Sequence, residues 1–244
     1  MLHISLSNLV SGWYKFPKAL PYYAQFASPE LIYAYIHENF DGRNDPHWHD
    51  YGSEDVEEYL FWHKRACAIA CLKMCLEALT SLPQVPTMIE LIRKGVDLGG
   101  YIVHNEQGEF VDSGWYYQPL AKLGEAYGLR GHVCKTLSTD ELCTYLAAES
   151  LVITSVSPEI GERDTPISKR GGHLVLVHGF EWSLQECKAF LLHNPSGRFP
   201  ELQANAVIPF DRFSQAFAGR GLVFESPSSE MNGSGKLSVI GFLT

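Results

Sequence analysis

Three cysteines, at positions 67, 71 and 75, lie in the largely apolar segment 62–79. Apolar residues recur there at helical spacing, so the segment is predicted to form a buried helix with the three thiols near one face. Cys71 and Cys75 are interpreted as small core residues, because reduced cysteine is often buried. Cys67 stands at the start of the apolar run, where first-turn amides and the helix dipole favour a thiolate. This position suits a cysteine nucleophile.

A cysteine nucleophile needs a base to accept its proton, and the chain holds ten histidines. His173 differs from the others because it follows Gly171 and Gly172 and begins an otherwise apolar run. Glycine allows close backbone approach and a strand would hold the imidazole rigidly, although a histidine that merely begins a strand is the alternative interpretation. Asn194 ends the next predicted strand, so antiparallel pairing of the two strands would let its side chain orient the imidazole.

The elements that must position these side chains are helices first and strands afterwards. Helical patterns cover 30–36, the region from 53, 62–79, 87–94, 115–127 and 138–148. Strand patterns cover 151–156, 173–180, 189–193, 206–209, 222–224 and 238–240. Helices followed by strands predict an α+β fold. We expect one domain over residues 1–244, with a helical lobe at about 20–148 and a strand-rich lobe at about 150–244.

The composition narrows the class of protein. The chain has 244 residues, of which 45% are hydrophobic and 19% charged, as in a soluble globular protein. The net charge of −9 argues against nucleic acid and anionic membranes as partners. No apolar stretch reaches the roughly 18 residues of a transmembrane helix. The N-terminus lacks the basic and apolar regions of a signal peptide, which predicts a cytoplasmic protein with reduced thiols.

No metal or cofactor is predicted. The six cysteines form no C-x-x-C pair, which excludes zinc-ribbon and thioredoxin motifs. Segment 45–50 contains two aspartates and two histidines, but it lacks the spacing of a helical zinc site. We interpret this segment as a loop that shapes a cleft.

Six short motifs occur together in a fixed order. They are Pro-Tyr-Tyr-Ala-Gln at 21–25, the cysteine helix start at 67–74, Gly-Trp-Tyr-Tyr-Gln-Pro-Leu at 114–120, the Gly-Gly-His strand at 171–179, His-Asn-Pro-Ser-Gly at 193–197 and Phe-Ala-Gly-Arg-Gly at 217–221. Their order resembles the papain-like cysteine peptidase superfamily. It is most similar to the bacterial group related to double-glycine leader peptidases, which are C39-like peptidases.

The resemblance implies a papain-like fold, in which a helical lobe with a central nucleophile helix packs on a C-terminal antiparallel sheet. It implies that Cys67 is the nucleophile and that His173 is the general base and then the acid. Asn194 would orient His173, and Gln25 would donate to the oxyanion together with the backbone N–H of Cys67.

Three functions follow as expectations. The first is a thiol-dependent peptidase or amide hydrolase that passes an acyl group from a peptide or small-molecule substrate through a thioester to water. The second is an acyltransferase or macrocyclising enzyme of natural-product biosynthesis, which uses the same residues with an amine acceptor. The third is a catalytically inactive peptide-binding module. Two departures from the family pattern favour the third: Ala68 stands where glycine is usual, and Gln25 lies 42 positions before Cys67, so that 37–58 would form an insertion.

Overall fold

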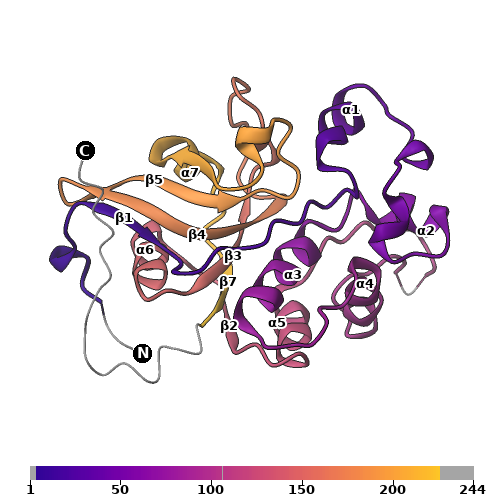
Figure 1. Ribbon diagram of the computed structural model, residues 1–244, viewed down its shortest axis with the longest axis horizontal. Coiled ribbons are helices and arrows are strands. Elements are labelled where there is room, and N and C mark those ends of the chain that lie inside the picture. The colour runs from indigo at the N-terminus through magenta and orange to yellow at the C-terminus, as the bar shows by residue number, and fades with distance from the viewer. Residues whose placement is uncertain (1–3, 106, 226–244) are drawn as a thin grey trace.

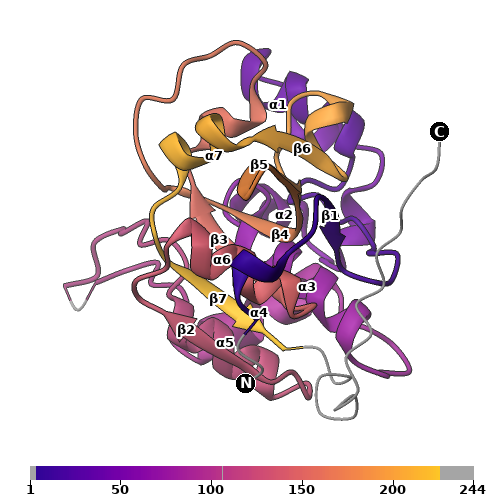
Figure 2. The same ribbon diagram turned by 90° about the vertical axis from the view of Figure 1, so that its left-hand side faces the viewer.

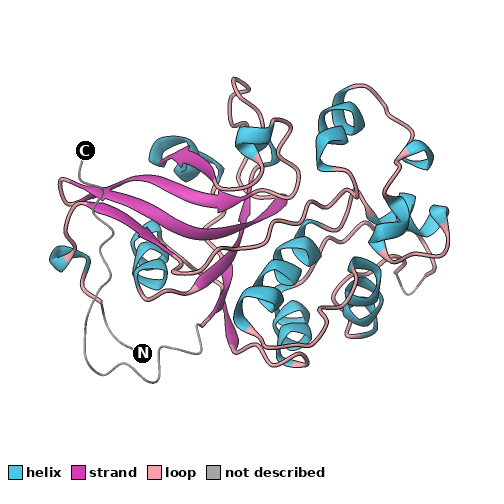
Figure 3. Ribbon diagram, in the orientation of Figure 1, coloured by secondary structure: helices cyan, strands magenta, loops and turns pink. Residues whose placement is uncertain are grey.

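Most of the helices lie at one side of the molecule, and the strands lie at the other side together with two helices, as Figure 1 and Figure 3 show for this computed structural model, which describes residues 4–105 and 107–225. The α-helices are α1 (Ile32–His37), α2 (Val56–Trp62), α3 (Cys67–Leu79), α4 (Met88–Asp97), α5 (Tyr117–Glu125), α6 (Thr139–Ala147) and α7 (Phe210–Ala216). The strands are β1 (Gly12–Lys15), β2 (Gly131–Cys134), β3 (Leu151–Val156), β4 (His173–Ser183), β5 (Glu186–His193), β6 (Ala206–Pro209) and β7 (Gly221–Phe224). Short 3-10 helices are η1 (Leu6–Asn8), η2 (Pro29–Leu31), η3 (Gly42–Asn44), η4 (Trp48–Tyr51), η5 (Pro158–Gly161) and η6 (Pro200–Leu202).

The described strands form one antiparallel sheet in the order β2-β7-β3-β4-β5-β6. Strand β4 is long enough to pair with β3 along its first half and with β1 along its second half. Its first residue, His173, lies opposite Val156 of β3. The predicted α+β fold, with helices before an antiparallel sheet, is therefore confirmed.

Alternating side chains of the central strands face two separate cores. One set packs with the buried faces of α3, α4 and α5: Leu151, Ile153, Leu174, Leu176, Leu222 and Phe224. The residues between them pack with α6 and α7: Val152, Val175, Val177 and Val223. This period of two is the geometry of a strand buried on both sides. Helices α1–α5 are called the helical lobe below, and the sheet with α6 and α7 is called the sheet lobe, as Figure 2 shows from the sheet side.

The segment predicted as one helix over 62–79 is divided in two. Helix α2 ends at Trp62, a turn follows, and α3 begins at Cys67. Two side chains donate hydrogen bonds to the backbone carbonyls of this turn. The Gln25 amide donates to the oxygen of His63, and the Trp115 indole donates to the oxygen of Arg65. Because these oxygens bond to side chains instead of helix amides, α2 does not continue into α3, and Cys67 becomes the first residue of a helix.

Strands β1 and β2 and helix α7 were not predicted. All three are short, and β2 is only half-buried, so none of them carries a strong periodic signal. Both β2 and α6 lie before residue 149 in the chain yet belong to the sheet lobe. The predicted strand at 238–240 lies outside the described residues. Within the described ranges, no helix is long and apolar enough to cross a membrane.

Candidate active site

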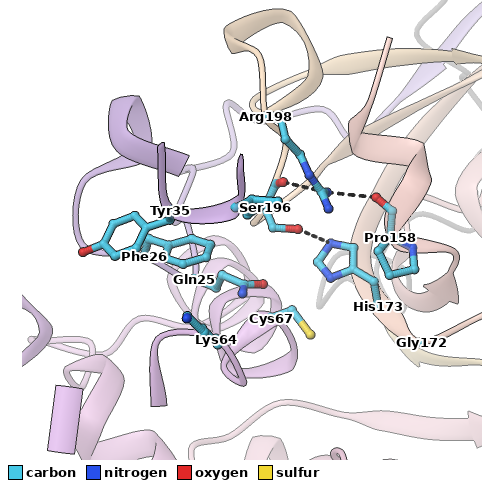
Figure 4. Close-up of a pocket in the computed structure, with 11 residues that line it drawn as sticks. Gln25, Phe26, Tyr35, Lys64, Cys67, Pro158, Gly172, His173, Ser196 and Arg198 are labelled. Atoms are coloured by element: carbon cyan, nitrogen blue, oxygen red, sulfur yellow. Dashed lines mark hydrogen bonds between the residues drawn. The ribbon is translucent and has the colours of Figure 1, made fainter. Parts of the chain in front are cut away.

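A pocket of about 330 Å³ lies between the two lobes (Figure 4). The helical-lobe side and the segment that leads to it contribute Gln25, Phe26, Tyr35, Ile36, Lys64 and Cys67. The sheet lobe contributes Pro158, Gly172, His173, Ser196 and Arg198. Three of the four residues predicted for the site, Gln25, Cys67 and His173, therefore line one pocket. The fourth, Asn194, hydrogen-bonds to His173.

Cys67 is the first residue of α3, and its side chain lies across the pocket from the His173 ring in Figure 4. The first amides of a helix have no acceptor within the helix. Burial nevertheless raises the pKa of the Cys67 thiol, and hydrogen bonding to the backbone at Leu174, Ala68 and Cys67 itself only partly offsets this. The expected lowering of the pKa by the helix start is thus present but is outweighed by desolvation.

His173 begins β4 and is held by a turn that follows β5. Its Nε2 lies 2.8 Å from Oδ1 of Asn194 and 3.2 Å from Oγ of Ser196. An amide oxygen only accepts hydrogen bonds, so Nε2 carries the proton and Nδ1 keeps the lone pair. Burial lowers the pKa of His173 to about 4; the bond to Asn194 opposes this shift, and the charge of Arg198 adds to it. The imidazole is therefore neutral near pH 7.

The amide of Asn194 has a defined orientation. The backbone N–H of Ser196 donates to the same Oδ1 at 3.1 Å, so two donors converge on one oxygen. This is an Asx turn, in which a side chain bonds to the backbone two residues later. Ser196 was missed by the sequence analysis, although the Asn-Pro-Ser order that builds this turn is visible in the chain.

Gln25 enters the pocket from a distant part of the chain. Its backbone N–H donates to the oxygen of Pro195, and its backbone oxygen accepts from the Tyr51 hydroxyl at 3.0 Å. Its side-chain Nε2 donates to the oxygen of His63 at 3.1 Å, which leaves the second N–H of the amide unassigned. The intervening residues pass through η2, α1, η3, η4 and α2 before the chain returns to Cys67.

The two glycines before His173 are required by their surroundings. Gly171 and Gly172 have φ angles of 76° and 101°, in the region that favours glycine. A Cβ on Gly171 would lie 3.0 Å from Oγ of Ser155 and 3.2 Å from Cβ of Ala218. The backbone of this segment also bonds to its neighbours, since Gly171 N–H donates to Ala216 and Gly172 N–H donates to Ser155. The tight packing fixes where β4 begins.

Arg198 joins the two loops that flank His173, and sequence reasoning missed it as well. Its Nη1 donates to the oxygens of Pro158 and Ser196 at 2.9 and 3.0 Å. Its Nε lies 2.9 Å from a carboxylate oxygen of Glu162, which also contacts His37 of α1 at 2.9 Å. The guanidinium thus connects the loop after β3, the loop after β5 and, through Glu162, the helical lobe.

Segment 45–50 has a structural role. The buried carboxylate of Asp45 accepts hydrogen bonds from Ser28, Tyr35 and Tyr59 at 2.6, 2.7 and 2.9 Å. These bonds occupy both of its oxygens and hold the segment against α1 and α2. Across residues 4–105 and 107–225, no group of three or more histidine, cysteine, aspartate or glutamate side chains is arranged to hold a metal ion.

One family model and three solved structures are similar to this chain. A model of the Peptidase C39-like family matches residues 49–221. Among solved structures, a C39-like peptidase from Bacillus anthracis is 16% identical, with a TM-score of 0.47, and the match covers 66% of this chain and 88% of that one. The peptidase domain of Streptococcus ComA, a bifunctional ABC transporter, is 12% identical with a TM-score of 0.42, over 67% and 93% of the two chains.

A third solved structure is a double-glycine motif protease from an AMS/PCAT transporter in complex with the leader peptide. It is 19% identical with a TM-score of 0.39, and the match covers 66% of this chain and 84% of that one. No curated protein matches the sequence.

Proposed function

The chain belongs to the Peptidase C39-like family, and from this we propose that it is a cysteine peptidase-like hydrolase with Cys67 as its nucleophile. The observation that carries the proposal is the hydrogen bond of 2.8 Å between Nε2 of His173 and Oδ1 of Asn194. It leaves the lone pair of Nδ1 available on the side of the ring where Cys67 lies (Figure 4). The family match includes these three residues and begins after Gln25.

The proposed reaction starts from a neutral thiol and a neutral imidazole, as the raised pKa of Cys67 and the lowered pKa of His173 favour. The sulfur attacks the carbonyl carbon of the substrate while Nδ1 of His173 accepts the thiol proton. The resulting oxyanion accepts hydrogen bonds from the Cys67 backbone N–H and from the Gln25 amide. Asn194 keeps the ring oriented throughout the proton transfer.

The tetrahedral intermediate then collapses. The carbon–nitrogen bond breaks, and the imidazolium gives its proton to the departing amine, which leaves an acyl thioester on Cys67. In hydrolysis, His173 removes a proton from water, which attacks the thioester and releases a carboxylic acid and the free thiol. In acyl transfer, an amine takes the place of water and forms a new amide. Both routes use the same residues.

The test compares Cys67→Ala with Cys71→Ala, a matched control one turn further along α3. The sulfur of Cys71 is fully buried and lies 3.6 Å from the oxygen of Leu174, so its loss affects packing but not the proposed nucleophile. Peptide mixtures are incubated with each protein, and products are identified by mass spectrometry. We expect Cys67→Ala to lower the rate by about 1000-fold or more and Cys71→Ala to leave the activity largely intact.

The products separate the possible functions. Two products whose masses sum to that of the substrate plus one water indicate hydrolysis. A product that joins the acyl part of one substrate to the amine of another, with release of the original amine, indicates acyl transfer. Activity that survives Cys67→Ala would contradict the proposed mechanism. A wild-type protein that binds peptides without converting them, and whose Cys67 reacts with iodoacetamide no faster than the similarly half-buried Cys187, would identify an inactive binding module instead.

A further inference from the structure

The charges that line the pocket are all of one sign. The eleven lining residues include two charged side chains, Lys64 and Arg198, and both are basic. The whole chain has the opposite balance, with 28 acidic and 19 basic residues. A pocket with basic side chains in an acidic protein is therefore a local feature of the site and does not follow from composition.

The positive charge of Arg198 is paired with an acidic residue. The Nε of Arg198 lies 2.9 Å from a carboxylate oxygen of Glu162, and its Nη1 bonds to two backbone oxygens. Its side chain is 10% exposed. The charge of this guanidinium is thus paired with Glu162, and its Nη1 holds two loops together, while its Nη2 makes no hydrogen bond to the described residues.

The positive charge of Lys64 has no acidic partner among the described residues. This lysine follows α2 in the turn that leads to Cys67, and it is exposed. It makes no hydrogen bond or ion pair with any residue in the described ranges, although its charge contributes, after burial, to the low pKa of His63. Figure 4 shows it beside Gln25 and Cys67 on the helical-lobe side of the pocket.

The wall next to Lys64 is largely apolar. It includes Phe26 and the ring of Tyr35, whose hydroxyl donates to Asp45 at 2.7 Å. An apolar wall lowers the local dielectric constant and strengthens the attraction between an ammonium group and an anion. Among the described residues, the pocket thus offers a lysine without an acidic partner beside an apolar surface, in the same lining as the proposed nucleophile.

We propose that Lys64 binds a carboxylate of the substrate in a subsite adjacent to Cys67. This inference rests on the proposed function and adds a substrate class to it: molecules with a carboxylate near the reacting carbonyl. The ammonium group would donate a charge-assisted hydrogen bond to that carboxylate. The carboxylate is either an acidic side chain or the free end of a peptide, and the experiment below separates the two.

The test uses alkylating probes in matched pairs, so it needs no known substrate. Bromoacetyl-glutamic acid α-amide and bromoacetyl-glutamine α-amide differ only in a side-chain carboxylate. Bromoacetylglycine and bromoacetylglycinamide differ only in a terminal carboxylate. In each reaction the sulfur of Cys67 bonds to the probe's methylene carbon, bromide leaves, and the thiol proton passes to His173. Rates of Cys67 labelling are followed by mass spectrometry at pH 8 and divided by the rates with 2-mercaptoethanol.

The wild-type protein is expected to react about tenfold faster with the acid than with the amide of at least one pair, and that pair identifies the source of the carboxylate. Lys64→Gln should remove this preference and Lys64→Arg should keep it. Lys122→Gln, which changes an exposed lysine of α5, should have no effect. Equal ratios in the wild type and in Lys64→Gln would overturn the subsite and leave the proposed function standing. A Cys67 inert to all four probes would overturn the proposed function and the inference with it.

Discussion

At the scale of single residues, the orientation of His173 depends on one oxygen atom. Oδ1 of Asn194 accepts from the imidazole at 2.8 Å and from the backbone of Ser196 at 3.1 Å, while Nδ2 of the same amide is buried without a partner among the described residues. Leaving a buried donor unsatisfied costs about 1–3 kcal/mol. The two bonds to Oδ1 must offset that cost, which explains why the turn holds Asn194 in this one orientation.

A residue-scale prediction concerns Gln25. Gln25→Ala removes a proposed oxyanion donor, and we expect kcat to fall about 100-fold, which corresponds to about 3 kcal/mol of transition-state stabilisation. The rate of Cys67 alkylation by iodoacetamide should change much less, because alkylation passes through no oxyanion. Steady-state kinetics and mass-spectrometric labelling on the same protein provide the comparison.

Gln203→Ala is the matched control for that change. The Gln203 amide donates to the oxygens of Pro29 and Gly197, outside the pocket lining, so its loss should lower stability without the large loss in kcat. If both variants lose activity equally, Gln25 acts only through the folded structure and does not stabilise the oxyanion.

At the scale of elements, the site depends on where α3 and β4 begin. Helix α3 starts at Cys67 because side chains bind the carbonyls of the preceding turn. Strand β4 starts at His173 because two glycines with positive φ angles turn the chain against β3 and the end of α7. Helical periodicity alone extended the first element back to residue 62, since periodicity does not record which partner a carbonyl finds.

The element-scale prediction is that Gly171→Ala displaces the start of β4. A Cβ at this position meets Ser155 and Ala218 at 3.0 and 3.2 Å, and the φ angle of 76° adds backbone strain. We expect a loss of about 1–3 kcal/mol in the free energy of unfolding. Activity per folded molecule should also fall, because His173 lies two residues further along. Urea unfolding and kcat measure the two effects.

Gly128→Ala separates strain from displacement. Gly128 has a φ angle of 91°, but a Cβ there would meet nothing within 4 Å. This variant should lose some stability and keep its full kcat. Normal kcat in folded Gly171→Ala would show that the position of His173 does not depend on the glycine.

At the scale of the whole molecule, the two lobes enclose several neutral histidines. Burial lowers the pKa of His63, His173 and His193 to about 4 in each case and that of His178 to about 3. In the unfolded chain the same groups would titrate near 6.5. The unfolded state therefore binds more protons than the folded state between about pH 6.5 and 4.

It follows that the protein should lose stability as the pH falls through this window. Each histidine that is charged only in the unfolded state lowers the free energy of unfolding by about 1.4 kcal/mol per pH unit. Urea unfolding at pH 7.5, 6.0 and 5.0 measures the slope. His178→Leu should reduce it, because this variant removes the group with the lowest pKa. A free energy of unfolding that is constant from pH 7.5 to 5.0 would show that the buried histidines are protonated in the folded state.

The sequence by itself determined the α+β order of elements, the burial of Cys71 and Cys75 and the candidate residues Cys67, His173 and Asn194. These features follow from local pattern: hydrophobic period, glycine pairs and the order of short motifs. Their catalytic roles remain predictions for the experiments above.

Only the tertiary structure decided the remaining features of the site. It brought Gln25 into the pocket across 42 positions of sequence and placed Ser196 against the imidazole. It also placed Lys64 in the lining of the pocket with Cys67, without an acidic partner among the described residues. Burial, hydrogen-bond partners and compensation of charge arise between segments that are distant in the chain. A local pattern does not contain them. The pKa of the Cys67 thiol is an example: its position at a helix start predicted a lowered pKa, but burial between distant segments raises it.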